Sequence, residues 1–124
     1  MILGFKKRFV PLILIRSKKH TIREDQHNRW KAGIKIHMAT GVRTKDYKCF
    51  NDKDTCKSTQ EILISWIRRQ GKTTYAVYVD WICLSEKEVE TLAINDGFES
   101  IKDFLLWFND DFQGKIIHWT DLRY

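Results

Sequence analysis

Cysteine, proline and long apolar runs are all scarce in this 124-residue chain. The longest apolar run covers residues 9–15, which is far too short to cross a lipid bilayer. Basic residues precede this run, as in a secretory signal, but Arg16 to Lys19 follow it in place of a small-residue cleavage site. We therefore expect neither a membrane segment nor a secretory signal.

The three cysteines, Cys49, Cys56 and Cys83, are odd in number and show no C-x-x-C spacing. This pattern argues against a disulfide framework and against a standard zinc site. We expect free thiols in a reducing cytoplasm and no bound metal. The alternative is a Cys49–Cys56 pair, or a metal site that these two residues share with His27 or His37.

Several motifs of cofactor and hydrolase chemistry are also missing. The chain has no glycine-rich nucleotide loop, no metalloprotease helix and no G-x-S-x-G elbow. No cofactor is indicated. The four histidines are scattered, and His37 and His118 fall in alternating segments, where we expect hydrogen-bonded structural groups rather than metal ligands.

Acidic residues are scarce in the N-terminal part of the chain. Residues 1–48 contain thirteen Lys and Arg but only three acidic residues, a net charge of +10. The remaining residues contain nine basic and thirteen acidic residues, a net charge of −4. Such asymmetry favours a polyanionic partner such as RNA for the N-terminal half, although a solvated basic surface is the alternative.

The length of the chain predicts a single domain over residues 1–124, and its sequence pattern predicts an α+β fold. Apolar residues alternate, as in half-buried strands, in the segments 34–39, 62–66 and 75–79. A strand is also expected over residues 19–23, and a last strand over residues 116–122. Gln70-Gly71-Lys72 has the composition of a hairpin turn, Gln113-Gly114-Lys115 that of a turn before the last strand, and residues 51–59 that of a polar surface loop. These features predict a small, mostly antiparallel β-barrel with flanking helices.

Three helices are predicted, each from its apolar stripe and its ends. A helix over about residues 8–16 has Pro11 in its first turn, where proline is tolerated. Ser85 and Glu88 have the spacing of a capping box, and Gly97 is suited to end the helix that they begin. Ser100 begins the third helix in the same way.

Residues 17–25 are almost entirely polar, yet apolar segments flank them on both sides. In a strand, Thr21 and Arg23 would face one side, and Lys18 would lie in the preceding turn. A threonine hydroxyl is a nucleophile only when a base removes its proton, and Lys18 could be that base if burial or cationic neighbours lower its pKa. The residues alone favour the alternative, in which Lys18 and Arg23 bind phosphate.

Basic and aromatic residues are interleaved at Arg29-Trp30-Lys31, which would suit base stacking with a phosphate contact. The alternative, which we favour, is that Trp30 caps one end of the barrel. As ligand contacts at the periphery of a basic cleft we name Trp30 and Arg43.

The segment R-S-K-K-H-T-I-R at residues 16–23 resembles the G-x-K-x-x-T-x-R element of ASCH domains, with Arg16 in place of the glycine. A second element of that family is a helix that ends in Glu-Gly-aromatic, and Asp96-Gly97-Phe98 is similar to it. The turn at residues 30–33 also fits. The order and spacing of these elements make the chain resemble the ASCH family, whose members are related to PUA RNA-binding domains.

The resemblance implies a PUA-like barrel whose cleft, lined by Lys18, Thr21 and Arg23, binds RNA or a modified nucleoside. One small bacterial branch of the family hydrolyses the acetyl amide of N4-acetylcytidine. Its catalytic lysine, threonine and glutamate fall on Lys18, Thr21 and Asp96, the last being one methylene shorter. Binding of RNA or a nucleotide is thus the leading hypothesis, and amide hydrolysis is its alternative. A third hypothesis is a protein-interaction module whose acidic helices contact a basic partner.

Overall fold

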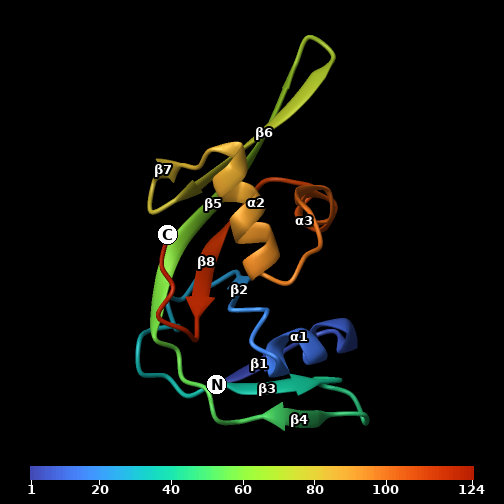
Figure 1. Cartoon of the computed structure of the whole chain (residues 1–124), viewed down its shortest axis with the longest axis vertical. Helices are drawn as coiled ribbons and strands as arrows, with labels where there is room; N and C mark the ends of the chain where they lie inside the picture. Colours follow the sequence, from blue (N-terminus) through green and yellow to red (C-terminus); the bar gives the residue numbers. More distant parts are fainter.

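The computed structural model describes the whole chain, residues 1–124, as an α+β fold with two mostly antiparallel sheets (Figure 1). The strands are β1 (Ile2–Gly4), β2 (His20–Arg23), β3 (His37–Thr40), β4 (Lys48–Asn51), β5 (Ser58–Arg69), β6 (Lys72–Val79), β7 (Ile82–Cys83) and β8 (Phe112–His118). The helices are the 3-10 turn η1 (Lys7–Phe9), α1 (Val10–Leu14), α2 (Glu86–Asn95) and α3 (Ile101–Trp107).

The strands form two separate sheets rather than the closed barrel that the sequence predicts. One sheet has the order β1-β3-β4, with β1 parallel to β3, and the other has the order β2-β8-β5-β6-β7, with every neighbouring pair antiparallel. The α+β class and the antiparallel pairing are confirmed. No helix in the structure is long and apolar enough to cross a lipid bilayer.

The hairpin of β5 and β6 forms as its alternating sequence predicts. Ile62 and Ile64 point into the core, and the pairing runs from Ile62 with Val79 to Arg69 with Lys72. The turn consists of Gln70 and Gly71, both with positive φ, as a tight two-residue hairpin requires. The far end of this hairpin, residues 67–74, is exposed and projects beyond the rest of the chain (Figure 1).

The helices begin and end close to the predicted positions. At the start of α2 the Ser85 hydroxyl accepts the backbone N–H of Glu88, and the Glu88 carboxylate accepts the backbone N–H of Ser85, which is a complete capping box. The buried side of α2, made by Val89, Leu92 and Ala93, belongs to the hydrophobic core. The chain leaves α2 through Gly97, whose φ of 96° is left-handed.

The predicted turn at residues 113–115 is wrong, because these residues lie inside β8. Gly114 allows a close approach of two strands instead, because a Cβ on it would clash with the main-chain oxygen of Arg23 in β2. Glycine inside a strand commonly marks such an approach. The last strand therefore begins and ends several residues earlier than the sequence predicts.

The loop between β4 and β5 is less exposed than its polar composition suggests. Asp54 is buried and accepts hydrogen bonds from Arg16 at 2.8 Å and from Asn51 at 2.7 Å. Cys56 is completely buried in the core. All three cysteines are free, so the Cys49–Cys56 disulfide does not form, and no cluster of His, Cys, Asp and Glu suited to a metal ion gathers anywhere in the structure.

Candidate active site

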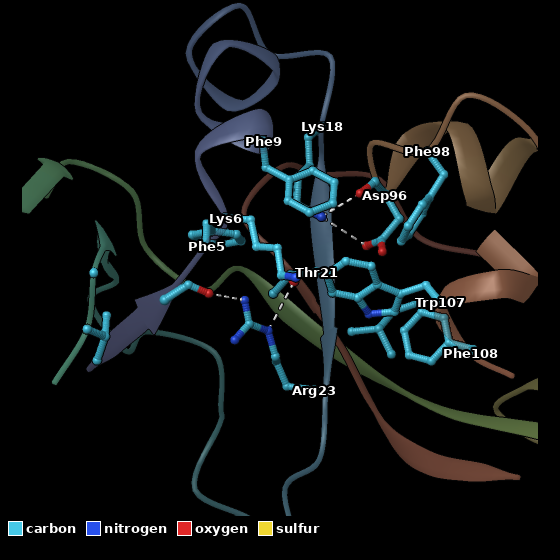
Figure 2. Close-up of a pocket in the computed structure, with 14 residues that line it drawn as sticks. Phe5, Lys6, Phe9, Lys18, Thr21, Arg23, Asp96, Phe98, Trp107 and Phe108 are labelled. Carbon is cyan, nitrogen blue, oxygen red and sulfur yellow. Dashed lines mark hydrogen bonds and ion pairs between the residues drawn. The ribbon is translucent and has the colours of Figure 1, made fainter. Parts of the chain in front are cut away.

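A cavity of about 410 Å³ lies where β1, η1 and β2 face the end of α2 and helix α3 (Figure 2). Five aromatic side chains line it, namely Phe5, Phe9, Phe98, Trp107 and Phe108. Trp107 is 43% exposed and marks the rim, whereas the four phenylalanines are buried. The polar part of the lining comes from Lys6, Lys18, Thr21, Arg23 and Asp96.

Lys18 lies in the turn before β2, as predicted, and only 2% of its surface is exposed. Its ammonium donates a hydrogen bond of 2.5 Å to the main-chain oxygen of Asp96 and lies 3.4 Å from Asp96 Oδ1. The lysine therefore caps the C-terminal end of α2, where a cation is favoured by the helix dipole. Gly97 makes room for it, because a Cβ there would approach Lys18 Cδ to 3.2 Å.

The surroundings of Lys18 work against its charged form. Burial, the largest influence, lowers the pKa of Lys18, and the nearby cations Arg23 and Arg8 lower it further. Asp96 acts in the opposite direction, but the net effect is a lowered pKa. The Nζ atom also lies 4.9 Å from the ring centre of Phe9, which stabilises the ammonium while it exists.

Thr21 and Arg23 lie on one face of β2, as the alternation predicts, and both line the cavity. Arg23 Nε donates a hydrogen bond of 3.2 Å to Thr21 Oγ1, and its NH2 group donates one of 2.6 Å to the main-chain oxygen of Gly4 (Figure 2). Burial lowers the pKa of Arg23, while Asp96 raises it. The two hydrogen bonds hold the Arg23 guanidinium beside the Thr21 hydroxyl.

Asp96 is the last member of this group, and it is 3% exposed at the C-terminal end of α2. Its carboxylate faces the Lys18 side of the cavity (Figure 2). The same oxygen, Oδ1, is 2.9 Å from Nδ1 of His20. The structure thus brings Lys18, Thr21, Arg23 and Asp96 to the wall of one cavity, although Asp96 lies far from the others along the chain.

The remaining two predicted ligand contacts lie elsewhere. Trp30 is 7% exposed and packs in the hydrophobic core, and its backbone N–H is bonded to Asp25, so it does not line this cavity. Arg43 is an exposed turn residue; the preceding Gly41 and Val42 line the cavity, but Arg43 does not. Of the residues at 29–31, Trp30 therefore belongs to the core, and Arg29 and Lys31 are exposed.

Two groups that bear on the site are not evident from the sequence. His20 is completely buried and binds Asp96, although its place in the alternation puts it on the side opposite Thr21. Tyr124 binds His20 through its hydroxyl. Nothing in the local sequence pairs residues that are 76 and 104 positions apart. The aromatic lining of the cavity cannot be recognised from the sequence either, because Phe5, Phe9 and Phe98 have the pattern of ordinary core residues.

Comparison with protein-family models, with curated proteins and with solved structures gives no match to this chain. The geometry of the site therefore carries the chemical argument. A hydroxyl, an amine with a lowered pKa, a carboxylate and a guanidinium surround one partly enclosed space with aromatic walls. These are the groups that covalent hydrolysis of an amide requires: a nucleophile, a base, a group that orients the base and a donor for the developing oxyanion.

Proposed function

We propose that the chain is an ASCH-type, PUA-like amidohydrolase that removes an acyl group from the exocyclic nitrogen of a pyrimidine nucleoside such as N4-acetylcytidine. The observation that carries the proposal is the convergence of Lys18, Thr21 and Asp96 on one cavity, each no more than 4% exposed. Scattered positions would have favoured a purely binding role.

The size and the walls of the cavity fit a nucleoside. Its volume of about 410 Å³ falls within the range of small-molecule sites. Phe5, Phe9 and Phe98 offer flat apolar surfaces for a base, and Trp107 at the rim offers another. The Arg23 guanidinium and the rim residue Lys6 supply cationic donors for ribose or phosphate oxygens. A ligand with one flat ring and several polar groups would satisfy this lining.

In the first step, neutral Lys18 accepts the proton of the Thr21 hydroxyl while Thr21 Oγ1 attacks the acyl carbon. The carbonyl π electrons move to the oxygen, and Arg23, already within hydrogen-bond distance of Thr21 Oγ1, donates to this oxyanion. The bond from carbon to the exocyclic nitrogen then breaks. Its electron pair stays on the nitrogen, which takes the proton from the Lys18 ammonium and leaves as the free amine.

In the second step, water attacks the acyl-threonine ester and gives its proton to Lys18. The ester bond breaks, Thr21 recovers its proton, and the acyl group leaves as the carboxylic acid. Asp96 has a constant role through both steps, because it holds the lysine Nζ at 3.4 Å and offsets its charge whenever the lysine is protonated. No oxidant, reductant or further reactant is needed.

The test is incubation of the protein with N4-acetylcytidine and measurement of cytidine by chromatography. Thr21→Val keeps the shape of the side chain but removes the hydroxyl, so we expect a loss of about 10³-fold or more in kcat. Thr21→Ser keeps the hydroxyl and should retain measurable turnover. Absence of cytidine with the wild-type protein, or equal turnover by Thr21→Val, would remove this function.

RNA binding without catalysis is the second candidate, and the charge distribution favours it. Besides the excess of basic residues in the N-terminal half, the exposed end of the β5–β6 hairpin contains Arg68, Arg69 and Lys72 and no acidic residue. A projecting basic arm can follow a phosphate backbone while the cavity accepts one unstacked base.

Gel retention of single-stranded RNA over a range of salt concentrations tests this candidate. We expect the triple change Arg68→Ala, Arg69→Ala and Lys72→Ala to weaken binding and to reduce the salt dependence by about one unit of slope for each phosphate that the arm no longer neutralises. A control triple of Lys53→Ala, Lys87→Ala and Lys102→Ala removes the same charge from other surfaces. If both triple variants and the Lys18→Ala/Arg23→Ala double variant retain RNA as well as the wild-type protein does, RNA binding at these residues is excluded.

A further inference from the structure

A chain of hydrogen bonds, buried at His20 and partly buried at Tyr124, leads from the cavity to the C-terminal residues. Asp96 Oδ1 is 2.9 Å from His20 Nδ1, His20 Nε2 is 2.5 Å from the Tyr124 hydroxyl, and that hydroxyl is 3.1 Å from Asn95 Nδ2. His20 is completely buried between these partners. Neither His20 nor Tyr124 lines the cavity, so neither can touch a ligand there.

The chemistry of the partners fixes the direction of each hydrogen bond. Asn95 Nδ2 can only donate, so the Tyr124 oxygen accepts from it and donates its own proton to His20 Nε2. Burial lowers the pKa of His20, and burial raises the pKa of Tyr124, so both groups are neutral near neutral pH. The one imidazole proton therefore resides on Nδ1 and is donated to the Asp96 carboxylate.

We propose that His20, oriented by Tyr124, is a positioning residue that fixes the Asp96 carboxylate and competes with Lys18 for it, so that Lys18 can release its proton and act as a base. The proposal rests on the proposed function. The same oxygen, Asp96 Oδ1, faces both the His20 N–H and the Lys18 ammonium. Its negative charge is thereby shared between two donors, and its hold on the lysine proton is weaker than that of an otherwise free carboxylate.

Several other charged groups surround Lys18 and His20. Lys18 faces Asp96, Arg23 and Arg8, and Lys6 lines the same cavity. Around His20 lie Lys18 and Lys19, the Asp96 carboxylate and the ring of His118, whose centre is 5.2 Å away. Asp96 is the only acid among them, so it is the one group whose charge favours the protonated lysine.

Three variants distinguish the effect of the hydrogen bond from His20 to Asp96 from the effect of filling the same space with a side chain. His20→Asn places an amide N–H near the position of Nδ1, and His20→Leu fills the site without a donor. Tyr124→Phe keeps His20 but removes the hydroxyl that fixes its tautomer. Without the donor, Asp96 has Lys18 as its only side-chain partner, so we expect the pKa of Lys18 to rise and kcat to fall by roughly 10²-fold with little change in KM.

The deciding measurement is the pH titration of Lys18 by NMR of the protein with isotope-labelled lysine side chains, assigned by Lys18→Arg. We expect a higher Lys18 pKa in His20→Leu, a smaller shift in the same direction in Tyr124→Phe, and recovery toward the wild-type value in His20→Asn. In parallel, the acidic limb of the kcat/KM profile should move to higher pH by the same amount.

These readouts keep the two proposals apart. The NMR titration needs no substrate, so a wild-type protein without hydrolase activity would remove the proposed function and leave the His20 network testable. Equal Lys18 titration in wild type, His20→Leu and Tyr124→Phe would overturn the positioning role even if hydrolysis is found. If His20→Leu fails to fold, as judged by thermal unfolding, the titration of the milder Tyr124→Phe variant decides between the two outcomes.

Discussion

The molecule contains two buried lysines, each paired with an aspartate, and their surroundings differ. Lys18 is 2% exposed and lies 3.4 Å from Asp96; Lys115 is 7% exposed and lies 3.2 Å from Asp25. Each pair joins segments that lie far apart along the chain. The two pairs are nearly equivalent in residue type, in the distance from lysine nitrogen to aspartate oxygen and in the burial of their side chains.

Their neighbours differ. The Asp25 carboxylate also accepts the backbone N–H groups of Arg29 and Trp30, at 2.8 and 2.9 Å, and Lys115 also donates to the Asn28 side chain. This pair therefore ties the loop after β2 to strand β8, beside a hollow that no hydrophobic residue lines. The Lys18–Asp96 pair instead borders an aromatic cavity and shares its carboxylate with a histidine. Both pairs border a hollow, so space alone does not separate them; the aromatic walls and the shared carboxylate make the Lys18–Asp96 pair the candidate site.

Replacing each lysine by methionine is the strongest test of this comparison. Lys18→Met and Lys115→Met each leave a buried carboxylate without its cation, so we expect each to lower the free energy of unfolding by about 3–5 kcal/mol. Only Lys18→Met should also abolish hydrolysis of N4-acetylcytidine, by about 10³-fold or more in kcat. Urea unfolding and the cytidine assay measure the two effects.

The matched pair makes the result easy to interpret. Because Lys115→Met shares the loss of stability, it controls for inactivity caused by partial unfolding. Comparable activity losses in the two variants would mean that Lys18 acts only as the cap of α2. An inactive Lys18→Met beside an active Lys115→Met would separate the catalytic pair from the structural one.

A smaller effect is expected from the glycine that lets the chain pass close to Lys18. Gly97 and Gly33 have almost the same φ, 96° and 95°, but a Cβ on Gly97 would meet Phe9 at 3.1 Å and Lys18 at 3.2 Å, whereas nothing lies within 4 Å of one on Gly33. We expect Gly33→Ala to cost about 1 kcal/mol of stability, from its backbone conformation alone, and Gly97→Ala to cost roughly 1–3 kcal/mol.

The difference between the two glycine variants isolates the packing around Lys18. It should appear as a lower thermal midpoint for Gly97→Ala than for Gly33→Ala, together with reduced turnover in Gly97→Ala alone. Identical thermal midpoints for the two variants would show that the side chains of Phe9 and Lys18 move aside without loss of stability.

The sequence was sufficient for features that are encoded locally. The β5–β6 hairpin follows from its alternation and its Gln70-Gly71 turn, and α2 follows from the Ser85–Glu88 capping box. The strand face of Thr21 and Arg23 was also predictable, because period-two alternation is a local property. The turn at residues 113–115 was wrong because a glycine has the same letter whether it allows a turn or the close approach of a neighbouring strand.

Features that depend on distant contacts could not be deduced in this way. The arrangement of the strands into two sheets depends on which edges meet, and β1 pairs with β3 across a long stretch of intervening chain. The partnership of Lys18 with Asp96 was suggested by a family resemblance rather than by any physical signal. The hydrogen bonds that join Asp96, His20 and Tyr124 were indicated by neither a resemblance nor a physical signal. In the sequence, a histidine that binds a distant carboxylate looks the same as any other histidine in a strand.

The surroundings of the two pairs should also respond to acid over different ranges of pH. The ring of His118 packs against that of His20, the histidine that binds Asp96. Burial, the neighbouring His20 and the cation Arg123 lower the pKa of His118 from its ordinary 6.5 to about 3. Between these values the unfolded chain binds a proton that the native protein does not, so the free energy of unfolding falls as the pH is lowered. One such proton corresponds to a slope of at most about 1.4 kcal/mol per pH unit.

Asp25 loses its contribution to stability in the same direction, but only at lower pH. Burial alone would raise the pKa of Asp25, but the backbone N–H groups and Lys115 outweigh it and lower the pKa below its ordinary 3.8, so its pair persists until the pH falls below that value. Urea unfolding from about pH 7 to about pH 4.5 should therefore show a slope that His118→Gln reduces and Asp25→Asn leaves unchanged. A slope that disappears in Asp25→Asn instead would place the acid-sensitive contact at the structural pair, and the contrast between the two pairs would be reversed.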